Sequence, residues 1–341
     1  MQKYGFMKRK ASDKLTLNFD ECVTLFVAAK RLQKRSDRTI NTYQQTYQAF
    51  SRWLTDKEYD YVDGNIAKEY IEYISFEKHR WDNHPTSPTG EKGLSSRAVN
   101  NIVRNLKVLF NFLVQERIIT ASPFETVRYQ TEPRDTFEVF TDEDVLKLLD
   151  VPNRRTYTGN RDYVMMLVLM DTGLRIRELT SLKVKDIDFK IQQIVVRAEN
   201  TKTYSMRVIP ISDKCTKELR NLLEYMTLDD EEEYVWLTQF GERYMADTFS
   251  KMLKNYGKKA VVLNARVSPH TFRHYFAVKY LKSGGDTFSL MRILGHSDMS
   301  MTQRYVKYTN MDVHDRHNTA SPVMNLLDKG NERKRGKVLF K

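Results

Sequence analysis

The sequence predicts a mainly α-helical protein of two domains, with one small antiparallel β-sheet in the second domain. Three observations support this fold class. The 341 residues exceed the usual size of a single hydrophobic core. Apolar residues recur every three or four positions over most of the chain, as they do in amphipathic helices. Within residues 187–211, however, Val and Ile alternate with polar residues in three short runs, which is typical of strands.

The first helical region covers residues 18–127. Its early part places Tyr43, Tyr47, Phe50 and Leu54 at three- and four-residue steps. Residues 98–114 also carry an apolar stripe with basic side chains outside it. Between these segments, residues 82–90 contain two prolines and a glycine, so we expect a surface loop there.

Changes in composition predict the domain boundaries. Residues 1–17 form a basic arm, and residues 128–138 have little periodicity and one proline, which indicates a linker. The second domain, residues 139–318, opens with Thr141 followed three residues later by Asp144, a pattern typical of a helix start. Residues 319–341 form a C-terminal segment with a basic tail.

The net charge of +12 comes from 56 basic and 44 acidic residues. Residues 1–17 hold five Lys or Arg against one Asp, and residues 328–341 hold six against two acids, so most of the excess lies at the two ends. This balance favours a polyanionic partner, with nucleic acid as the first candidate. The alternative is that basic tails merely aid solubility.

The cysteine and hydropathy patterns exclude several classes of protein. Cys22 and Cys215 lie far apart, and neither belongs to a CxxC or Cys/His array that would indicate zinc or a disulfide framework. The longest central apolar run, Val164–Met170, is much shorter than the ~20 residues that cross a bilayer. The N-terminus also lacks the apolar core of a signal peptide. We expect a cytoplasmic protein with no membrane partner.

The segment from Val267 to His274 is the first that suggests chemistry. Ser268 suits an N-cap and Pro269 suits the first helical position, so a helix should begin here. His270 and Arg273 then lie one turn apart, near a helix N-terminus that favours a phosphate oxygen. Taken alone, such a segment is more often an ordinary charged helix face.

Residues 172–179 add a second guanidinium. Gly173 allows a tight turn between two helices, and Arg175 and Glu178 lie one turn apart on the second helix. The simple interpretation is an internal ion pair. Together with Arg273, however, Arg175 could clamp the non-bridging oxygens of one phosphate.

Residues 294–305 add an imidazole and a phenol. Gly295 is expected to end one helix, and the next helix carries Tyr305 nine positions after His296. Because the chain has 19 tyrosines, any single one is more often a packing residue than a nucleophile. Tyr305 therefore depends on its neighbours for its significance.

Taken together, these motifs resemble the tyrosine recombinases of the phage-integrase type, which include Xer-type dimer resolvases and many transposon integrases. The resemblance covers residues 140–305 closely and the N-terminal helices only in type, as a SAM-like core-DNA-binding domain. Three differences occur: Phe272 replaces a frequent leucine, Arg177 replaces a small polar residue, and Tyr308 follows Tyr305 by one turn. The motifs that carry the resemblance, in family order, are Thr172-Gly-Leu-Arg175-Ile, His270-x-x-Arg273-His274, Leu294-Gly-His296 and Tyr305.

The resemblance also implies a catalytic role for Lys202. This lysine stands in a Thr-Lys-Thr connection between two predicted strands, where the family carries a mobile catalytic lysine. The following Arg207–Ile211 run supports this alignment. Without the resemblance, a lysine in a hairpin is nearly always only solvated.

The implied reaction needs no metal ion, ATP or other cofactor. Tyr305 would attack the scissile phosphate to give a 3′-phosphotyrosine and a free 5′-hydroxyl, which conserves the energy of the ester. Arg175 and Arg273 would stabilise the phosphorane, and Lys202 would protonate the departing 5′-oxygen. His270 would act as acid and base near the tyrosine hydroxyl, and His296 would donate a hydrogen bond to the phosphate. Glu178 would orient the site.

The implied partner is double-stranded DNA with specific recombination sites, bound by four protomers on two sites. Val323, Met324, Leu326 and Leu327 form an apolar patch that could dock on a neighbouring protomer or fold back on its own domain. An accessory directionality protein is also possible. The basic N-terminal arm and the loop near Pro85 and Pro88 favour a mobile-element integrase or transposase. The alternatives are a Xer-type chromosome or plasmid dimer resolvase, a type IB topoisomerase-like relaxing enzyme, and a non-catalytic DNA-binding accessory protein.

Overall fold

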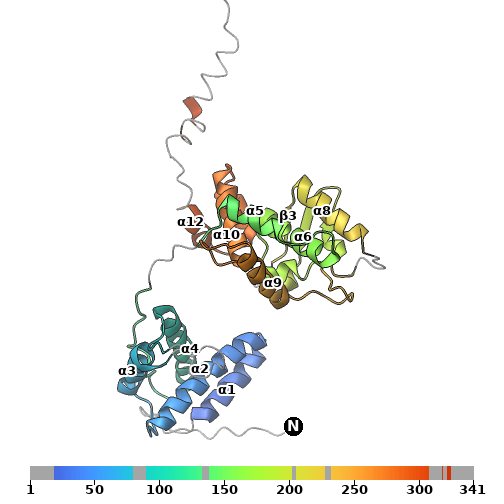
Figure 1. Ribbon diagram of the computed structural model, residues 1–341. Helices are drawn as coiled ribbons and strands as arrows, with labels where there is room; N and C mark the ends of the chain where they lie inside the picture. The colour runs from blue at the N-terminus through green and yellow to red at the C-terminus, as the bar shows by residue number, and fades with distance from the viewer. Residues whose placement is uncertain are drawn as a thin grey trace, which may run out of the picture. The chain divides into compact units, whose positions relative to one another are not determined.

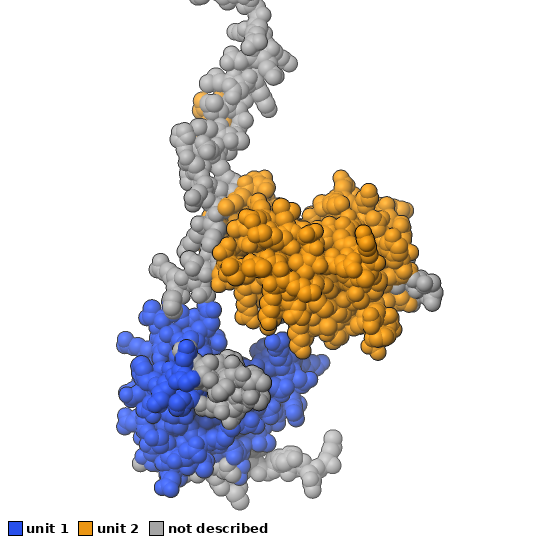
Figure 2. Space-filling model, in the orientation of Figure 1, with its two compact units in different colours: residues 1–135 blue, residues 136–341 orange. Residues whose placement is uncertain are grey.

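The computed structural model describes residues 19–79, 90–132, 138–201, 205–226, 232–306, 317 and 321–323. The chain divides into two compact units, residues 1–135 and residues 136–341, each with its own core (Figure 2). Several sequence predictions lie outside the described residues: the basic arm, most of the loop at residues 82–90, Lys202, and all of the C-terminal apolar patch except Val323.

The first unit is a helical bundle, as predicted (Figure 1). Ser36, Asp63 and Ser95 cap three of its helices, each accepting a hydrogen bond from a backbone N–H of the first turn. Its core is rich in aromatic rings; Phe26, for example, meets Tyr47 edge-on at 5.5 Å. The elements are α1 (Phe19–Leu32), α2 (Asp37–Asp56), α3 (Gly64–Glu72), a π-helical turn η1 (Tyr73–Glu77) and α4 (Ser96–Gln115).

The second unit is helical with one small sheet, which confirms the predicted fold class. Its helix α5 begins at the predicted cap, where Thr141 and Asp144 form a capping box. The helices are α5 (Asp142–Asp150), α6 (Tyr157–Thr172), α7 (Ile176–Leu179), α8 (Asp213–Glu224), α9 (Ala246–Lys259), α10 (Pro269–Lys282), α11 (Thr287–Leu294) and α12 (Ser300–Val306), with 3₁₀ turns η2 (Val184–Asp186) and η3 (Ala198–Asn200).

The sheet is a three-stranded antiparallel meander in the order β1-β2-β3. Its strands are β1 (Ile187–Asp188), β2 (Gln193–Val196) and β3 (Arg207–Pro210), all within residues 187–211, where the sequence predicts three strands. Ile194 of β2 pairs with Ile187 on one side and with Ile209 on the other. All three side chains are buried, so this row forms the face of the sheet that packs on the core.

Helix α6 occupies the centre of the second unit. It buries Val164, Met165, Val168 and Leu169, and it packs against α8 and α10. The helix begins at Tyr157, where Thr156 caps it by accepting a hydrogen bond from the Gly159 N–H.

A second, smaller core joins α10, α11 and α12. Phe276, Leu281, Leu290 and Leu294 are buried there together with Tyr305. This packing fixes α12 against α10, so the ring of Tyr305 belongs to the core of its own chain. Among the helices that the structure describes, no helix has the length and apolar composition needed to cross a membrane.

Candidate active site

The turn between α6 and α7 lets three helices approach closely. Gly173 ends α6 in the left-handed region, with φ of +60°. A Cβ atom at this position would lie 2.4 Å from Cδ1 of Phe276 and 2.8 Å from Cδ2 of Leu294. Glycine is therefore required by both the backbone and the space. The Gly173 carbonyl in turn accepts a hydrogen bond of 2.7 Å from Nη1 of Arg273.

Glu178 holds two guanidiniums in place. Arg175 Nη1 donates to Glu178 Oε1 at 2.9 Å, and Arg207 Nη2 donates to Oε2 at 2.7 Å. Glu178 is 1 % exposed. Burial alone would raise its pKa, but the hydrogen bond and charge of Arg207 and the charge of Arg175 outweigh burial and hold the pKa below its usual value. Glu178 is therefore ionised at neutral pH, and it orients both arginines.

Arg175 forms the predicted internal ion pair and still reaches the site. Its other terminal nitrogen, Nη2, donates to the Gly295 carbonyl at 3.2 Å, and its side chain keeps 24 % exposure. Arg207 of β3 donates from Nε to the Ile293 carbonyl at 2.8 Å. The sheet, α7 and the end of α11 are thus joined through one buried carboxylate.

Arg273 is the most deeply buried cation of the cluster. Helix α10 begins as predicted, with Ser268 as N-cap and Pro269 at the first turn. Arg273 Nη2 donates to the Leu294 carbonyl at 2.8 Å and lies 3.0 Å from His296 Nε2. Burial and the nearby charge of Arg175 lower the pKa of Arg273 to about 10, so it remains protonated at neutral pH.

His296 follows the glycine that ends α11. Gly295 has φ of +64°, and a Cβ there would lie 3.0 Å from the Arg207 guanidinium carbon. Because Arg273 can only donate, His296 Nε2 accepts its hydrogen bond, and Nδ1 carries the hydrogen toward Thr302 Oγ1 at 2.8 Å. Burial and the charge of Arg273 lower the pKa of His296 to about 4, so the ring is neutral.

Tyr305 lies on α12 and is 2 % exposed. Its ring stacks parallel to that of His296, with centroids 6.3 Å apart. Its hydroxyl oxygen lies 2.9 Å from Nδ1 of His274. Burial raises the pKa of Tyr305, although the positive charges of Arg273 and Arg304 oppose this effect. The phenol is therefore protonated and surrounded by cations.

The structure brings together five of the predicted site residues through a chain of contacts. His270 lies one turn before Arg273 on α10 and is exposed, and Lys202 lies outside the described residues. The contacts that the described residues make join Tyr305, His296, Arg273, Arg175 and Glu178.

Sequence reasoning assigned no role to three residues: His274, Arg207 and Thr302. His274 appeared only as part of a motif, although it lies four residues after His270, so both project from one side of a helix. Arg207 appeared only in the run that supports the alignment of Lys202. Nothing in the sequence indicates that Thr302 fixes the tautomer of His296.

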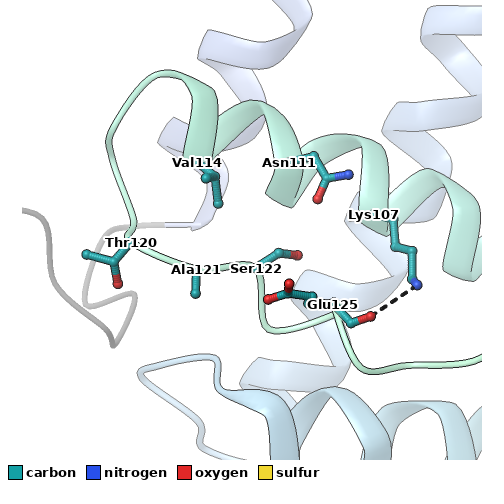
Figure 3. A pocket seen from close by; sticks show the side chains of 7 residues that line it. All are labelled: Lys107, Asn111, Val114, Thr120, Ala121, Ser122 and Glu125. Carbon is teal, nitrogen blue, oxygen red and sulfur yellow. Dashed lines mark hydrogen bonds between the residues drawn. The ribbon is translucent and has the colours of Figure 1, made fainter.

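The first unit has a separate hollow beside α4 (Figure 3). Its polar end is closed by Lys107, whose ammonium lies 3.5 Å from the Glu125 carbonyl oxygen. Its lining contains no histidine, cysteine or tyrosine, whereas all the predicted site residues belong to the second unit. The residues that line it are Lys107, Asn111, Val114, Thr120, Ala121, Ser122 and Glu125.

A helical domain followed by a domain that gathers two arginines, a histidine and a buried tyrosine defines the class of tyrosine recombinases. Comparison with known families agrees: residues 138–311 match the phage integrase family, and residues 24–131 match the phage integrase SAM-like domain. The chain belongs to the phage integrase family and is a DNA strand-transferring enzyme, a site-specific tyrosine recombinase.

Similar curated proteins carry the name of tyrosine recombinases. The chain is 30% identical over 287 residues to the tyrosine recombinase XerD of Listeria monocytogenes serotype 4b (strain F2365), covering 82% of this chain and 91% of that protein. It is 31% identical over 225 residues to the tyrosine recombinase XerC of Myxococcus xanthus, covering 64% of this chain and 74% of that protein.

Solved structures share the fold. A lambda integrase dimer bound to a COC′ core site aligns with a TM-score of 0.65 and 18% identity, covering 89% of this chain and 80% of that one. The Tn1549 transposon integrase in complex with a circular intermediate DNA aligns with a TM-score of 0.60 and 24% identity, covering 83% of this chain and 94% of that one. These likenesses concern the fold alone.

Proposed function

We propose that the protein is the integrase or transposase of a mobile element, and that Tyr305 is its nucleophile. Tyr305 attacks the scissile phosphate, forms a 3′-phosphotyrosine and releases a 5′-hydroxyl. The 5′-hydroxyl of the partner strand then reverses the step, through a Holliday junction. The observation that carries this proposal is the position of Tyr305, whose ring stacks parallel to that of His296 while His296 lies 3.0 Å from the Arg273 guanidinium.

Arg175 and Arg273 form the phosphate clamp in this proposal. Backbone carbonyls at Gly173, Leu294 and Gly295 fix both guanidiniums. Donors that are already oriented stabilise the charge of a phosphorane without reorganising during the reaction. Glu178 orients Arg175 by accepting a hydrogen bond from its guanidinium, and Arg207 fixes Glu178 by donating a hydrogen bond to the same carboxylate.

The remaining groups transfer protons or donate hydrogen bonds in this proposal. Lys202 is the general acid for the departing 5′-oxygen, and His270 is an acid or base near the site. His296 Nε2 accepts a hydrogen bond from Arg273, so His296 becomes a phosphate donor only when Nε2 gains a hydrogen. The negative charge of a bound phosphate favours that protonation, because it opposes the arginine charges that lower the His296 pKa.

The DNA partner is a duplex that carries two recombination sites, bound by four protomers. The net charge of +12 supports binding that depends mainly on phosphate contacts. The C-terminal segment, which carries Val323, is assigned to the exchange between protomers. An accessory protein would set the direction of the reaction.

A two-site DNA substrate tests this function. The wild-type protein first selects its sites from a randomised duplex pool, and two copies are then placed on one supercoiled circle. Recombinant products support the proposal. Relaxation without recombinants would support a topoisomerase-like enzyme instead, and binding without any covalent adduct would support a non-catalytic accessory protein.

A Xer-type dimer resolvase is the second candidate, because the curated relatives above are named XerD and XerC. The two candidates differ in their sites. Sites at the ends of a mobile element, joined by the protein into a circle, support the integrase, whereas a single chromosomal site that resolves dimers supports the resolvase.

A further inference from the structure

A second histidine of α10 contacts the reacting oxygen of the proposed nucleophile. His274 follows Arg273 directly, and its Nδ1 lies 2.9 Å from Tyr305 Oη. The ring centroids are 5.6 Å apart and the planes are tilted by 48°. His274 is half-buried, whereas His270, which the sequence placed near this hydroxyl, is exposed.

The Tyr305 hydroxyl is within hydrogen-bond distance of the imidazole of His274. Nδ1 of His274 accepts the phenol hydrogen when the neutral ring carries its own hydrogen on Nε2. Burial, followed by the charges of Arg304, His270 and Arg273, lowers the pKa of His274 to about 4. The ring is therefore neutral at neutral pH and has a bare nitrogen that can accept a proton.

The other imidazole beside Tyr305 has no nitrogen left for this task. His296 Nε2 accepts from Arg273 at 3.0 Å, and Nδ1 contacts Thr302 Oγ1 at 2.8 Å. Its ring stacks on the Tyr305 ring and does not meet the hydroxyl edge-on. Among the imidazoles that the structure describes around Tyr305, His274 has the geometry of a proton acceptor.

We propose that His274 is the general base that removes the Tyr305 proton during strand cleavage. This inference rests on the function proposed above. As Tyr305 Oη bonds to phosphorus, its O–H bond breaks and the proton moves to His274 Nδ1. The bond from phosphorus to the 5′-oxygen breaks, and that oxygen takes a proton from the general acid. In rejoining, the 5′-hydroxyl returns its proton to the deprotonated general acid as its oxygen attacks phosphorus, the bond from phosphorus to Tyr305 Oη breaks, and the departing Tyr305 oxygen takes its proton back from His274.

DNA binding strengthens this base. Among the described residues, the charged and titratable groups that face His274 include Arg304 and Tyr305 of α12 and His270 and Arg273 of α10. A phosphate held by Arg273 brings negative charge beside these cations. Imidazolium is then better tolerated, so His274 becomes more basic when the substrate is present than when it is absent.

The His274→Asn variant tests the proposal. Asparagine keeps a polar atom close to the position of Nδ1 and can accept the phenol hydrogen bond, but it cannot take a proton. His274→Ala removes both properties. The matched control is Tyr275→Phe on the same helix, which removes only a hydroxyl that donates to Asp142. The substrate is a duplex selected by the wild-type protein and nicked 3′ of the scissile phosphate, so that the short fragment with the 5′-hydroxyl diffuses away.

Single-turnover formation of the covalent adduct is measured between pH 6.5 and 9.5. We expect His274→Asn and His274→Ala both to cleave about 10²–10³-fold more slowly at pH 7, as for loss of a general base, with DNA affinity and thermal unfolding close to wild type. Their rates should rise about tenfold per pH unit, because the proton must then leave to hydroxide. Tyr275→Phe should follow the wild-type profile.

Two results would overturn the role of His274. One is an Asn variant that cleaves within threefold of wild type, since accepting a hydrogen bond would then be sufficient. The other is a slow variant whose pH profile runs parallel to that of wild type. Where His274→Ala fails to fold, His274→Asn alone decides. Failure of the wild-type protein to form any adduct is a separate result that would contradict the proposed function.

Discussion

Arg273 and His296 share a hydrogen bond that sets the state of both side chains before DNA arrives. The arginine donates, so the imidazole is neutral with its hydrogen on Nδ1, toward Thr302. The ring of Tyr305 stacks parallel to that of His296. At the residue scale, these groups are therefore assembled within one chain, with the arginines oriented and Tyr305, the proposed nucleophile, protonated.

The clamp predicts that Arg273→Lys and Arg175→Lys lose rate more than affinity. Lysine cannot reproduce the planar contacts to two carbonyls, so cleavage should slow by about 10²–10³-fold while duplex affinity changes little. Single-turnover cleavage and equilibrium binding measure the two effects. A methylphosphonate at the scissile position lacks the charge that the two arginines neutralise. On this substrate, the cleavage rates of wild type and of both variants should therefore differ less. If the cleavage rates differ as much on this substrate as on the charged phosphate, the proposed role of the two arginines is contradicted.

The buried histidines predict that stability falls on acidification. Burial lowers the pKa of His296 and of His274 to about 4, below the ordinary value of about 6.5. Between these values the unfolded chain binds more protons than the folded one, so stability is lost as pH falls from about 6.5 toward 4. The melting temperature of His296→Gln should fall less over this window than that of wild type, whereas exposed His79→Gln should follow wild type. If the melting temperatures of all three proteins fall equally with pH, His296 is not a cause of the acid destabilisation.

At the element scale, the site depends on how closely α6, α10 and α11 approach at two left-handed glycines. Gly173 ends α6 against Phe276 and Leu294, and Gly295 ends α11 against Arg207. Each glycine is followed within two residues by a site side chain, Arg175 or His296. The close contacts at these glycines therefore position the site side chains as well as the core residues.

Gly173→Ala should destabilise the protein more than a matched substitution elsewhere. Gly284 also has positive φ, of +91°, but a Cβ there meets nothing within 4 Å. Alanine costs roughly 1–2 kcal/mol of backbone strain at a left-handed position. At Gly173, overpacking adds roughly 1–3 kcal/mol. Chemical denaturation compares the two variants, and equal losses would show that the contact with Phe276 and Leu294 relaxes without cost.

Much of this architecture could be predicted from the sequence, because caps and periodicity are local. Ser268 and Pro269 start α10, Thr141 and Asp144 start α5, and Gly295 ends α11, all as expected. Long-range partners could not be predicted in this way. His274 meets Tyr305 across 31 residues, and Arg207 meets Glu178 across 29. Such contacts depend on the packing of whole elements, which spacing along the chain does not encode.

At the scale of the whole molecule, the two units have separate cores, and we expect both to contribute positive charge to DNA binding. Their combined excess of positive charge predicts steep salt dependence of DNA binding. If the units together make six to ten phosphate contacts, affinity should fall by about 10³–10⁵-fold between 50 and 200 mM salt. Fluorescence anisotropy on a duplex measures the slope. Removing residues 1–17 should reduce this slope. If the affinity of the wild-type protein changes less than threefold between 50 and 200 mM salt, binding driven by phosphate contacts is excluded.

The identity of the nucleophile is the central claim, and the attachment site of trapped DNA tests it most directly. The adduct formed on a nicked duplex is digested, and mass spectrometry locates the phosphotyrosine. We predict that it lies on Tyr305 and that Tyr305→Phe forms no adduct while it still binds DNA. Attachment to the neighbouring Tyr308, or undiminished strand cleavage by Tyr305→Phe, would contradict the account.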